Sequence, residues 1–186
     1  MVRRPVSSAS QAGLARFFDG MVGPAFGLLG LRDESIVKYV VDLLVRFARM
    51  DQLHRIRGAK GESLSTIAAL LMELSRQWEP EVPYKIDREL EIRRHCGDYA
   101  LFMSGLFRPF VEGRSLLTYY LEEGRHSYHV VAELKQMAFA GDAVIYGVLA
   151  KQFEHLSGGL DYVRKVHLAP HLNRGEYGEL LSQMGF

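Results

Sequence analysis

The chain has 186 residues, 48% hydrophobic and 24% charged, a composition that indicates a globular protein and excludes a disordered or fibrous one. Its formal net charge is +1, and basic and acidic residues are interspersed, which argues against a surface for nucleic acid or for acidic membranes. We expect a single domain of residues 1–186, long enough to bury a core without disulfides or structural metals.

The first residues are basic and contain several serines, and we interpret residues 1–12 as a frayed tail that leads into a short helix. The uncharged run that follows, residues 20–31, is shorter than the ~20 residues that a membrane-spanning helix needs. The sequence therefore predicts neither a secretion signal nor a membrane span.

Apolar periodicity predicts helices throughout the rest of the chain. The expected ranges are 33–49, 63–78, 87–109, 116–139 and 143–157. Gly158 and Gly159 either kink the last of these helices or separate it from a further segment, residues 160–168. Alternating strand patterns and hairpin signals are missing from the sequence. The predicted fold class is all-α, a bundle of five or six main helices.

The single cysteine, Cys96, rules out an intrachain disulfide and a cysteine-based zinc cluster. A reducing compartment is the simpler inference, so we expect a cytoplasmic protein. Because Cys96 lies among apolar residues within the third predicted helix, we interpret it as a small core residue. The alternative, a reactive nucleophile, rests on the neighbouring Arg94 and His95.

The third predicted helix changes character at Gly97 and Asp98, from densely charged to almost wholly apolar. Asp98 is therefore expected to be buried, and a buried carboxylate needs a partner or a proton. Arg94, four residues earlier, lies on the correct side of the helix to be that partner. Asp98 is then either part of a structural ion pair or a catalytic carboxylate in a pocket beside His95.

A histidine on the fifth predicted helix is the third candidate catalytic residue. His155 shares a helical side with Val144 and Val148, so we predict that it faces the protein interior. A histidine on an apolar face is a hydrogen-bonded core residue or a ligand. The inward-facing polar set predicted by the sequence consists of Glu91, His95, Asp98 and His155.

The fourth predicted helix carries a stripe of possible metal ligands. Glu122, His126, His129 and Glu133 are spaced by four, three and four residues, which places them on one face. Glu123 and His126 also form a Glu-x-x-His pair, the unit that di-iron carboxylate bundles carry on two of their helices. The stripe is thus compatible with a metal site.

Two observations weaken a metal site on this helix. Its apolar residues fall on the opposite face, so the stripe should face water, whereas a ligand set must face inward. A chain with 7 histidines and 22 acidic residues is expected to contain about one acid-x-x-His pair by chance. Two occur, Asp51/His54 and Glu123/His126. We therefore favour no metal or other cofactor.

Motifs for nucleotide binding, for serine nucleophiles and for zinc proteases are absent from the sequence. The favoured function is a non-catalytic helical module that binds a small ligand or a protein partner. We expect it to form homo-oligomers, because the mostly apolar helices 33–49 and 98–107 need more cover than one thin bundle layer gives. The alternative is a helical-bundle oxidoreductase or oxygenase that depends on a divalent metal or haem. Its candidate ligands are Glu91, His95, Asp98, Glu122, Glu123, His126, His129 and His155.

Residues 97–107 (GDYALFMSGLF) and 118–128 (TYYLEEGRHSY) fall within a stretch, 97–128, that is about a sixth of the chain. This stretch resembles a pattern found in uncharacterised all-helical proteins of bacteria. The resemblance implies a bacterial cytoplasmic origin and a pairing of the third and fourth predicted helices. It implies no activity.

Overall fold

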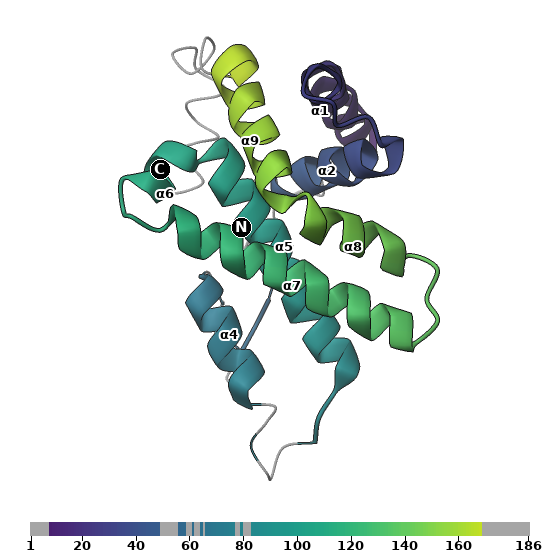
Figure 1. Cartoon of the computed structure of the whole chain (residues 1–186), viewed down its shortest axis with the longest axis vertical. Coiled ribbons are helices and arrows are strands. Elements are labelled where there is room, and N and C mark those ends of the chain that lie inside the picture. Colours follow the sequence, from purple (N-terminus) through teal and green to yellow (C-terminus); the bar gives the residue numbers. More distant parts are fainter. Residues whose placement is uncertain are drawn as a thin grey trace.

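The computed structural model describes residues 8–48, 56–58, 61, 64, 66–76, 79 and 83–168 (Figure 1). Within these ranges the chain forms eight α-helices and no β-strand, which confirms the predicted all-α class. The helices are α1 (Ser8–Leu28), α2 (Glu34–Phe47), α4 (Ile67–Arg76), α5 (Ile86–Leu106), α6 (Arg108–Glu112), α7 (Leu117–Met137), α8 (Ala143–Lys151) and α9 (Phe153–Val163), and α9 continues into a π-helical turn, Arg164–Leu168. No helix in the described ranges is long and apolar enough to span a membrane.

Helix α5 lies at the centre of the fold and packs against α7, α9, α4 and α2 (Figure 1). Its residues from 95 to 106 are all buried. The change from charged to apolar sequence at Asp98 therefore lies close to the point where the helix enters the core. The expected pairing of the third and fourth predicted helices is confirmed, because α5 packs along α7.

Two predicted boundaries are wrong. Helix α1 already begins at Ser8, so the second part of the predicted frayed tail is helical; residues 1–7 lie outside the described ranges. The predicted helix 143–157 breaks at Gln152, where φ is −102° and ψ is 12°. Gly158 and Gly159, by contrast, lie inside α9 without a break. Gly159 instead allows close packing, since a Cβ there would lie 2.8 Å from the ring of Phe26 on α1.

The chain itself covers the two apolar helices that were expected to need a second copy. Every residue from 98 to 106 of α5 is buried. On α2 the apolar side chains of Ile36, Val40 and Leu44 are at most 2% exposed. Helix α1 supplies part of this cover by packing across α2 and α9. These two helices therefore give no reason to expect self-association.

A second, smaller hydrophobic cluster joins α4 to the first half of α5. Its buried members are Ile56, Leu64, Leu70, Leu74, Ile92 and Cys96. Cys96 is 0% exposed, which confirms that it is a core residue. Burial raises the pKa of its thiol to about 12, so the thiol is a poor nucleophile at neutral pH.

Candidate functional site

The Asp98 carboxylate is enclosed by side chains from three helices. Its Oδ1 atom accepts hydrogen bonds from the hydroxyls of Tyr39 on α2 at 2.5 Å and of Tyr128 on α7 at 2.8 Å. Its Oδ2 atom accepts one from Arg46 on α2 at 3.0 Å, and Nε of Arg94 lies 3.8 Å from the same atom. Asp98 is 3% exposed. Both carboxylate oxygens therefore have protein partners, and the cluster ties α2, α5 and α7 together.

The predicted partner Arg94 is confirmed, but it is not the closest cation. Arg46 is nearer to Asp98 and lies 52 residues away in the sequence. The two tyrosines are also remote in sequence, with Tyr39 59 residues and Tyr128 30 residues from Asp98, although hydroxyls reaching a partner are expected of buried tyrosines. Of the two interpretations of Asp98, this geometry is that of a structural ion pair.

The same cluster shifts the proton equilibria of its two tyrosines. Burial and, second, the charge of Asp98 raise the pKa values of Tyr39 and Tyr128 well above the ordinary 10.0. Their hydroxyl protons thus remain in place to donate to the carboxylate across the whole physiological range.

Alkaline pH is expected to unfold the protein through these tyrosines. In the unfolded chain these tyrosines lose their protons near pH 10, whereas in the folded protein they retain them. The free energy of unfolding is therefore at its full value below that pH and decreases as the pH rises above it. The tyrosinate absorbance of Tyr39 and Tyr128 should appear only together with the loss of helical circular dichroism. Ionisation of all nine tyrosines near pH 10 with the helical signal intact would contradict this expectation.

His95 is a core residue in the described structure. It is 1% exposed, and its ring packs edge-on against Phe47 at 5.6 Å and stacks on Tyr99 at 6.5 Å between centroids. The predicted burial of His95 and Asp98 is therefore confirmed. The groups found around the Asp98 carboxylate are tyrosines and arginines.

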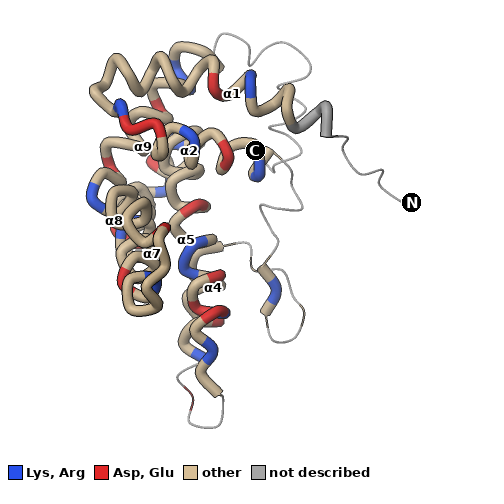
Figure 2. The backbone as a smooth tube through the Cα atoms, turned by 90° about the vertical axis from the view of Figure 1, so that its right-hand side faces the viewer, with Lys and Arg blue, Asp and Glu red and all other residues tan. Residues whose placement is uncertain are grey.

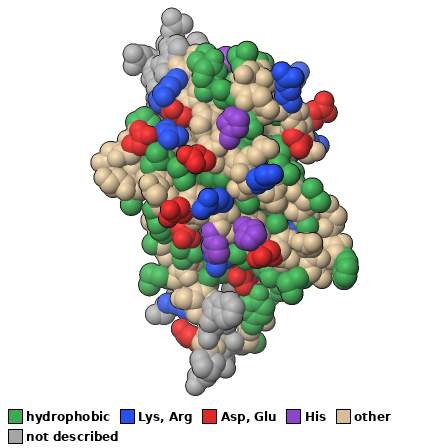
Figure 3. Space-filling view, in the orientation of Figure 1, with side chains coloured by type: hydrophobic (Ala, Val, Ile, Leu, Met, Phe, Trp, Pro, Cys, Tyr) green, Lys and Arg blue, Asp and Glu red, His purple; other side chains and the backbone are tan. Residues whose placement is uncertain are grey.

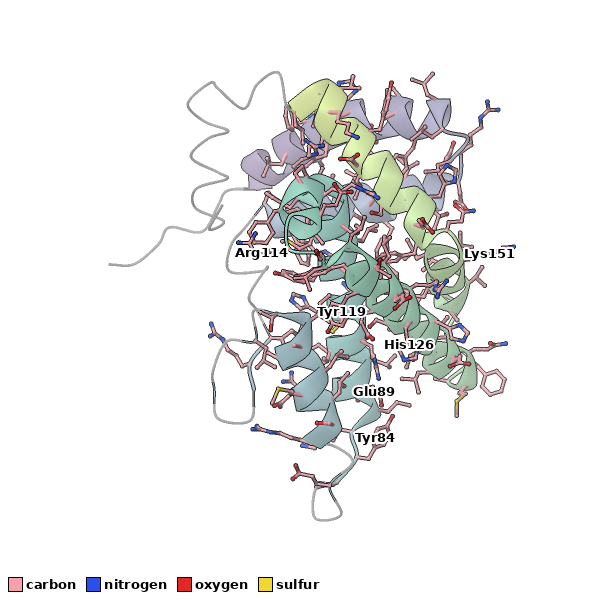
Figure 4. The ribbon with its side chains drawn as sticks, turned by 60° about the vertical axis from the view of Figure 1, so that its left-hand side comes forward. Tyr84, Glu89, Arg114, Tyr119, His126 and Lys151 are labelled. Atoms are coloured by element: carbon pink, nitrogen blue, oxygen red, sulfur yellow. The ribbon has the colours of Figure 1, made fainter. Side chains whose placement is uncertain are left out.

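A second buried carboxylate repeats this chemistry near the start of α5. The Tyr84 hydroxyl donates to Oε2 of Glu89 at 2.7 Å, and Nε of Arg93 lies 3.5 Å from Oε1 (Figure 4). Glu89 is 6% exposed. The hydrogen bond to Glu89, followed by burial, raises the pKa of Tyr84. Glu89 was not predicted from the sequence, because the first half of this helix is charged on several sides.

The prediction that His155 faces inward is wrong, since His155 is exposed. Val144, with which His155 was expected to share a buried side, is itself 75% exposed, and the helix is interrupted between the two residues at Gln152. Glu91 also lies at the surface, where it accepts a hydrogen bond from Arg88 at 2.8 Å. The predicted set of four inward-facing polar residues is therefore split between core and surface.

The stripe of possible ligands on α7 faces outward, as predicted. Glu122, His126, His129 and Glu133 are exposed, and Glu123 is half-buried. Nε2 of His129 lies 3.3 Å from Glu133, its neighbour on the same helix. Among the described residues no group of three or more histidine, cysteine or acidic side chains is placed to hold a metal ion. Asp51 and His54, the other acid-x-x-His pair, lie outside the described ranges.

Two of these histidines instead contribute to a basic hollow between α7 and α8, which we name the α7–α8 pocket. Its volume is about 330 Å³, and its lining consists of Arg125, His126, His129, Gly147, Ala150 and Lys151. Figure 4 shows His126 and Lys151 on the two adjacent helices. Figure 3 shows histidine side chains close to lysine and arginine side chains on this face of the molecule. His126 and His129 were candidate site residues in the sequence, whereas Arg125 and Lys151 were not predicted.

The α7–α8 pocket is distinguished by the sign of its charge. Elsewhere basic and acidic residues occur together along the helices (Figure 2). Among the described residues that line this pocket, four side chains are basic and none is acidic. Gly147 has no heavy atom within 4 Å of the position of a Cβ, so the floor on the α8 side is open. The pocket can therefore supply several nitrogen donors to one anion.

A larger groove of about 690 Å³ separates α1 from α2 but has no such bias. Three basic and three acidic side chains lie along it, and its remaining lining is apolar or glycine. The charged residues are Arg16, Asp19, Arg32, Glu34, Lys38 and Asp42. Because the two signs are balanced, the groove indicates no particular class of ligand.

Comparisons of the chain with models of known protein families, with curated proteins and with solved structures gave no match. The α7–α8 pocket must therefore be interpreted from its own chemistry.

Proposed function

We propose that this protein is a non-catalytic helical module that binds a small oxyanion, a phosphate or carboxylate group, in the α7–α8 pocket. The observation that carries the proposal is the convergence of four basic side chains from two helices on one hollow. Arg125 can grip an oxyanion with two parallel N–H donors, and Lys151 adds a charge from the opposite wall. The imidazoles of His126 and His129 provide further donors.

The size of the pocket limits the ligand. A hollow of about 330 Å³ lies at the lower end of the range for small-molecule sites, which supports a phosphate or a small phosphorylated or carboxylated molecule. Among the described residues, the nearest acidic group that the geometry ties to the pocket is Glu133, through its 3.3 Å contact with His129. An anion that displaces this contact would leave Glu133 free to turn to solvent.

The proposal also includes the domain organisation, self-association and localisation expected from the sequence. We interpret residues 1–186 as one helical domain of a self-associating cytoplasmic protein. The larger hydrophobic cluster supports the single domain, because it draws on α1, α2, α5, α7, α8 and α9. No observation favours the alternative of a metal- or haem-dependent oxidoreductase.

Reversing the charge of Lys151 should abolish most of the binding. Titration calorimetry of the full chain with inorganic phosphate at low ionic strength should show saturable binding. Lys151→Glu should weaken it about 10-fold or more, the value of one charge-assisted hydrogen bond. Arg125→Glu should act in the same direction, and the affinity of the unchanged protein should fall with added salt.

Lys38→Glu is the matched control, since it makes the same charge change in the α1–α2 groove. We expect less than about a twofold effect on phosphate affinity. If Lys38→Glu weakens binding and Lys151→Glu does not, the ligand lies in the groove and the proposal is wrong. Phosphate affinity that is unchanged in Lys151→Glu and Arg125→Glu would also refute it.

A further inference from the structure

Gly147, which lines the α7–α8 pocket, is a helical glycine that close packing does not require. Glycine inside a helix is less favourable than alanine, and close packing or a ligand near the backbone commonly compensates for it. At four other helical glycines a Cβ would lie within 2.8 Å of a neighbouring side chain: Gly97, Gly105, Gly124 and Gly159. At Gly147 a Cβ would meet no heavy atom of the described residues within 4 Å. The bare backbone at this position is therefore available to a ligand.

The α7–α8 pocket has a cationic end and an open end. Because α8 turns back along α7, residues at equal distances from the connecting turn lie at the same end of the pocket (Figure 1). Arg125 and Lys151 lie at the end far from the turn. His129 and Gly147 lie four residues nearer to it, about 6 Å away at helical rise. An oxyanion held by Arg125 and Lys151 thus leaves the space beside Gly147 for the rest of a ligand.

The open end lies on the side of α8 that forms the pocket. Gly147, Ala150 and Lys151 follow the spacing i, i+3, i+4, so a side chain at position 147 would project on the same side as theirs. A water molecule takes about 30 Å³ in the liquid, so a hollow of about 330 Å³ has room for a phosphate and several further atoms. The pocket is therefore larger than an inorganic anion needs.

The chemistry of the lining limits what the further atoms can be. None of the described residues that line the pocket has a carboxylate, amide or hydroxyl side chain, the usual partners of sugar hydroxyls. Glu133, 3.3 Å from Nε2 of His129, places a carboxylate beside the open end and opposes a second anionic group there. The methyl group of Ala150 and the backbone of Gly147 offer apolar contact instead. These conditions favour an uncharged group with few hydroxyls.

We propose that the ligand of the α7–α8 pocket is a phosphomonoester of a small apolar group, and that Gly147 determines this specificity. The phosphate lies at the cationic end, between Arg125 and Lys151, and the apolar group lies against Gly147 at the open end. The inference rests on the proposed function, because it requires that the pocket binds an oxyanion. It adds the chemical class of the ligand and the residue that selects it.

Phenyl phosphate is the probe, and inorganic phosphate is the reference ligand. Calorimetric titrations of the full chain at about pH 8 compare the two as dianions. The dissociation constant of phenyl phosphate should be about 10-fold lower or more, since its ring carbons leave water at the open end. Glycerol phosphate carries hydroxyls in place of the ring, and its dissociation constant should stay within about threefold of that of inorganic phosphate.

Gly147→Leu should remove the preference for the apolar group and leave the binding of inorganic phosphate intact. A leucine side chain would fill the open end, and leucine is a good helix former, so α8 should be retained. The affinity for phenyl phosphate should fall about 10-fold or more, whereas that for inorganic phosphate should change less than about twofold. Gly147→Ala, which adds one methyl group to an open position, should shift the two affinities in the same direction by a smaller factor.

Gly158→Leu is the matched control. Gly158 is a helical glycine with equally open surroundings, but it lies in α9, outside the lining of the pocket. Both affinities should equal those of the parent protein. Loss of phenyl phosphate affinity in this variant to the extent seen in Gly147→Leu would show that the effect of Gly147→Leu is not local, and would overturn the role of Gly147.

The outcomes separate this inference from the proposed function. If Lys151→Glu weakens inorganic phosphate binding but phenyl phosphate binds no more tightly than inorganic phosphate, the inference is wrong and the proposed function stands. A preference for phenyl phosphate that persists in Gly147→Leu would also overturn the inference. So would an equal loss of both ligands in Gly147→Leu with its helical circular dichroism unchanged. If Lys151→Glu affects neither ligand, the proposed function itself fails.

Discussion

Replacing Asp98 with alanine is expected to cost about 3–5 kcal/mol of the free energy of unfolding, the usual effect of removing one partner of a buried ion pair. The Tyr39 and Tyr128 hydroxyls would lose their acceptor in a site where water cannot easily replace it. Arg46 would lose its carboxylate at 3.0 Å. Since natural domains have roughly 5–15 kcal/mol of stability, Asp98→Ala should unfold at much lower urea concentration or not fold at all.

Removing one hydroxyl group from the edge of the Asp98 cluster should cost less stability than removing the carboxylate, and it serves as the control. Tyr39→Phe removes one hydroxyl and leaves Oδ1 of Asp98 with its bond from Tyr128, so a loss of about 1 kcal/mol is expected. Tyr39→Phe should also bind phosphate as the parent protein does, because the Asp98 cluster and the α7–α8 pocket share no lining residue. A cost below about 1 kcal/mol for Asp98→Ala would show that the cluster does not brace the fold.

The sequence predicted the features of the Asp98 cluster that depend on its own helix. An apolar neighbourhood after Gly97 indicated burial, and the four-residue spacing identified Arg94. Arg46 and Tyr39 could not be found in this way, because they come from α2, whose position beside α5 is a result of tertiary packing. A single sequence contains no signal for a contact across 52 residues.

His155 shows how a wrong choice of the buried side of a helix becomes a wrong prediction of orientation. The buried side was inferred from Val144 and Val148, but Val144 is 75% exposed, and the helix is also interrupted before His155. Gln152 interrupts the helix without proline or glycine, the two residues that normally signal a break. The glycine pair at 158–159, the visible signal, lies inside α9, where Gly159 allows close packing against α1.

The α7–α8 pocket was missed for a related reason. The stripe of Glu122, His126 and His129 was judged as a set of metal ligands on one helix, and its outward orientation was predicted correctly. Lys151 joins these histidines only because α8 turns back along α7. Arg125 was available in the sequence, beside His126, but a basic pair on an exposed helix face is ordinarily solvated.

Adding one methyl group to Gly124 is expected to destabilise the protein by about 2 kcal/mol, the middle of the range for overpacked cores. A Cβ at this position would lie 2.1 Å from the ring of Phe153 and 2.7 Å from Cβ of Ala100. Neither neighbour can move easily, since Phe153 is 1% exposed and packs against Tyr128, and Ala100 is fixed to the backbone of α5. Thermal or urea unfolding of Gly124→Ala measures the cost.

Gly158→Ala is the same chemical change at a position where the structure predicts a gain of stability instead of a loss. Gly158 lies within α9, and a Cβ there meets no heavy atom within 4 Å. Only the higher helix propensity of alanine then acts, which should stabilise the fold by up to about 1 kcal/mol. The same gain is present in Gly124→Ala, so the difference between the two variants isolates the clash between α7 and its neighbours. Equal effects would mean that α7 can shift away from α5 and α9 at little cost, and that glycine at 124 is not required for their close packing.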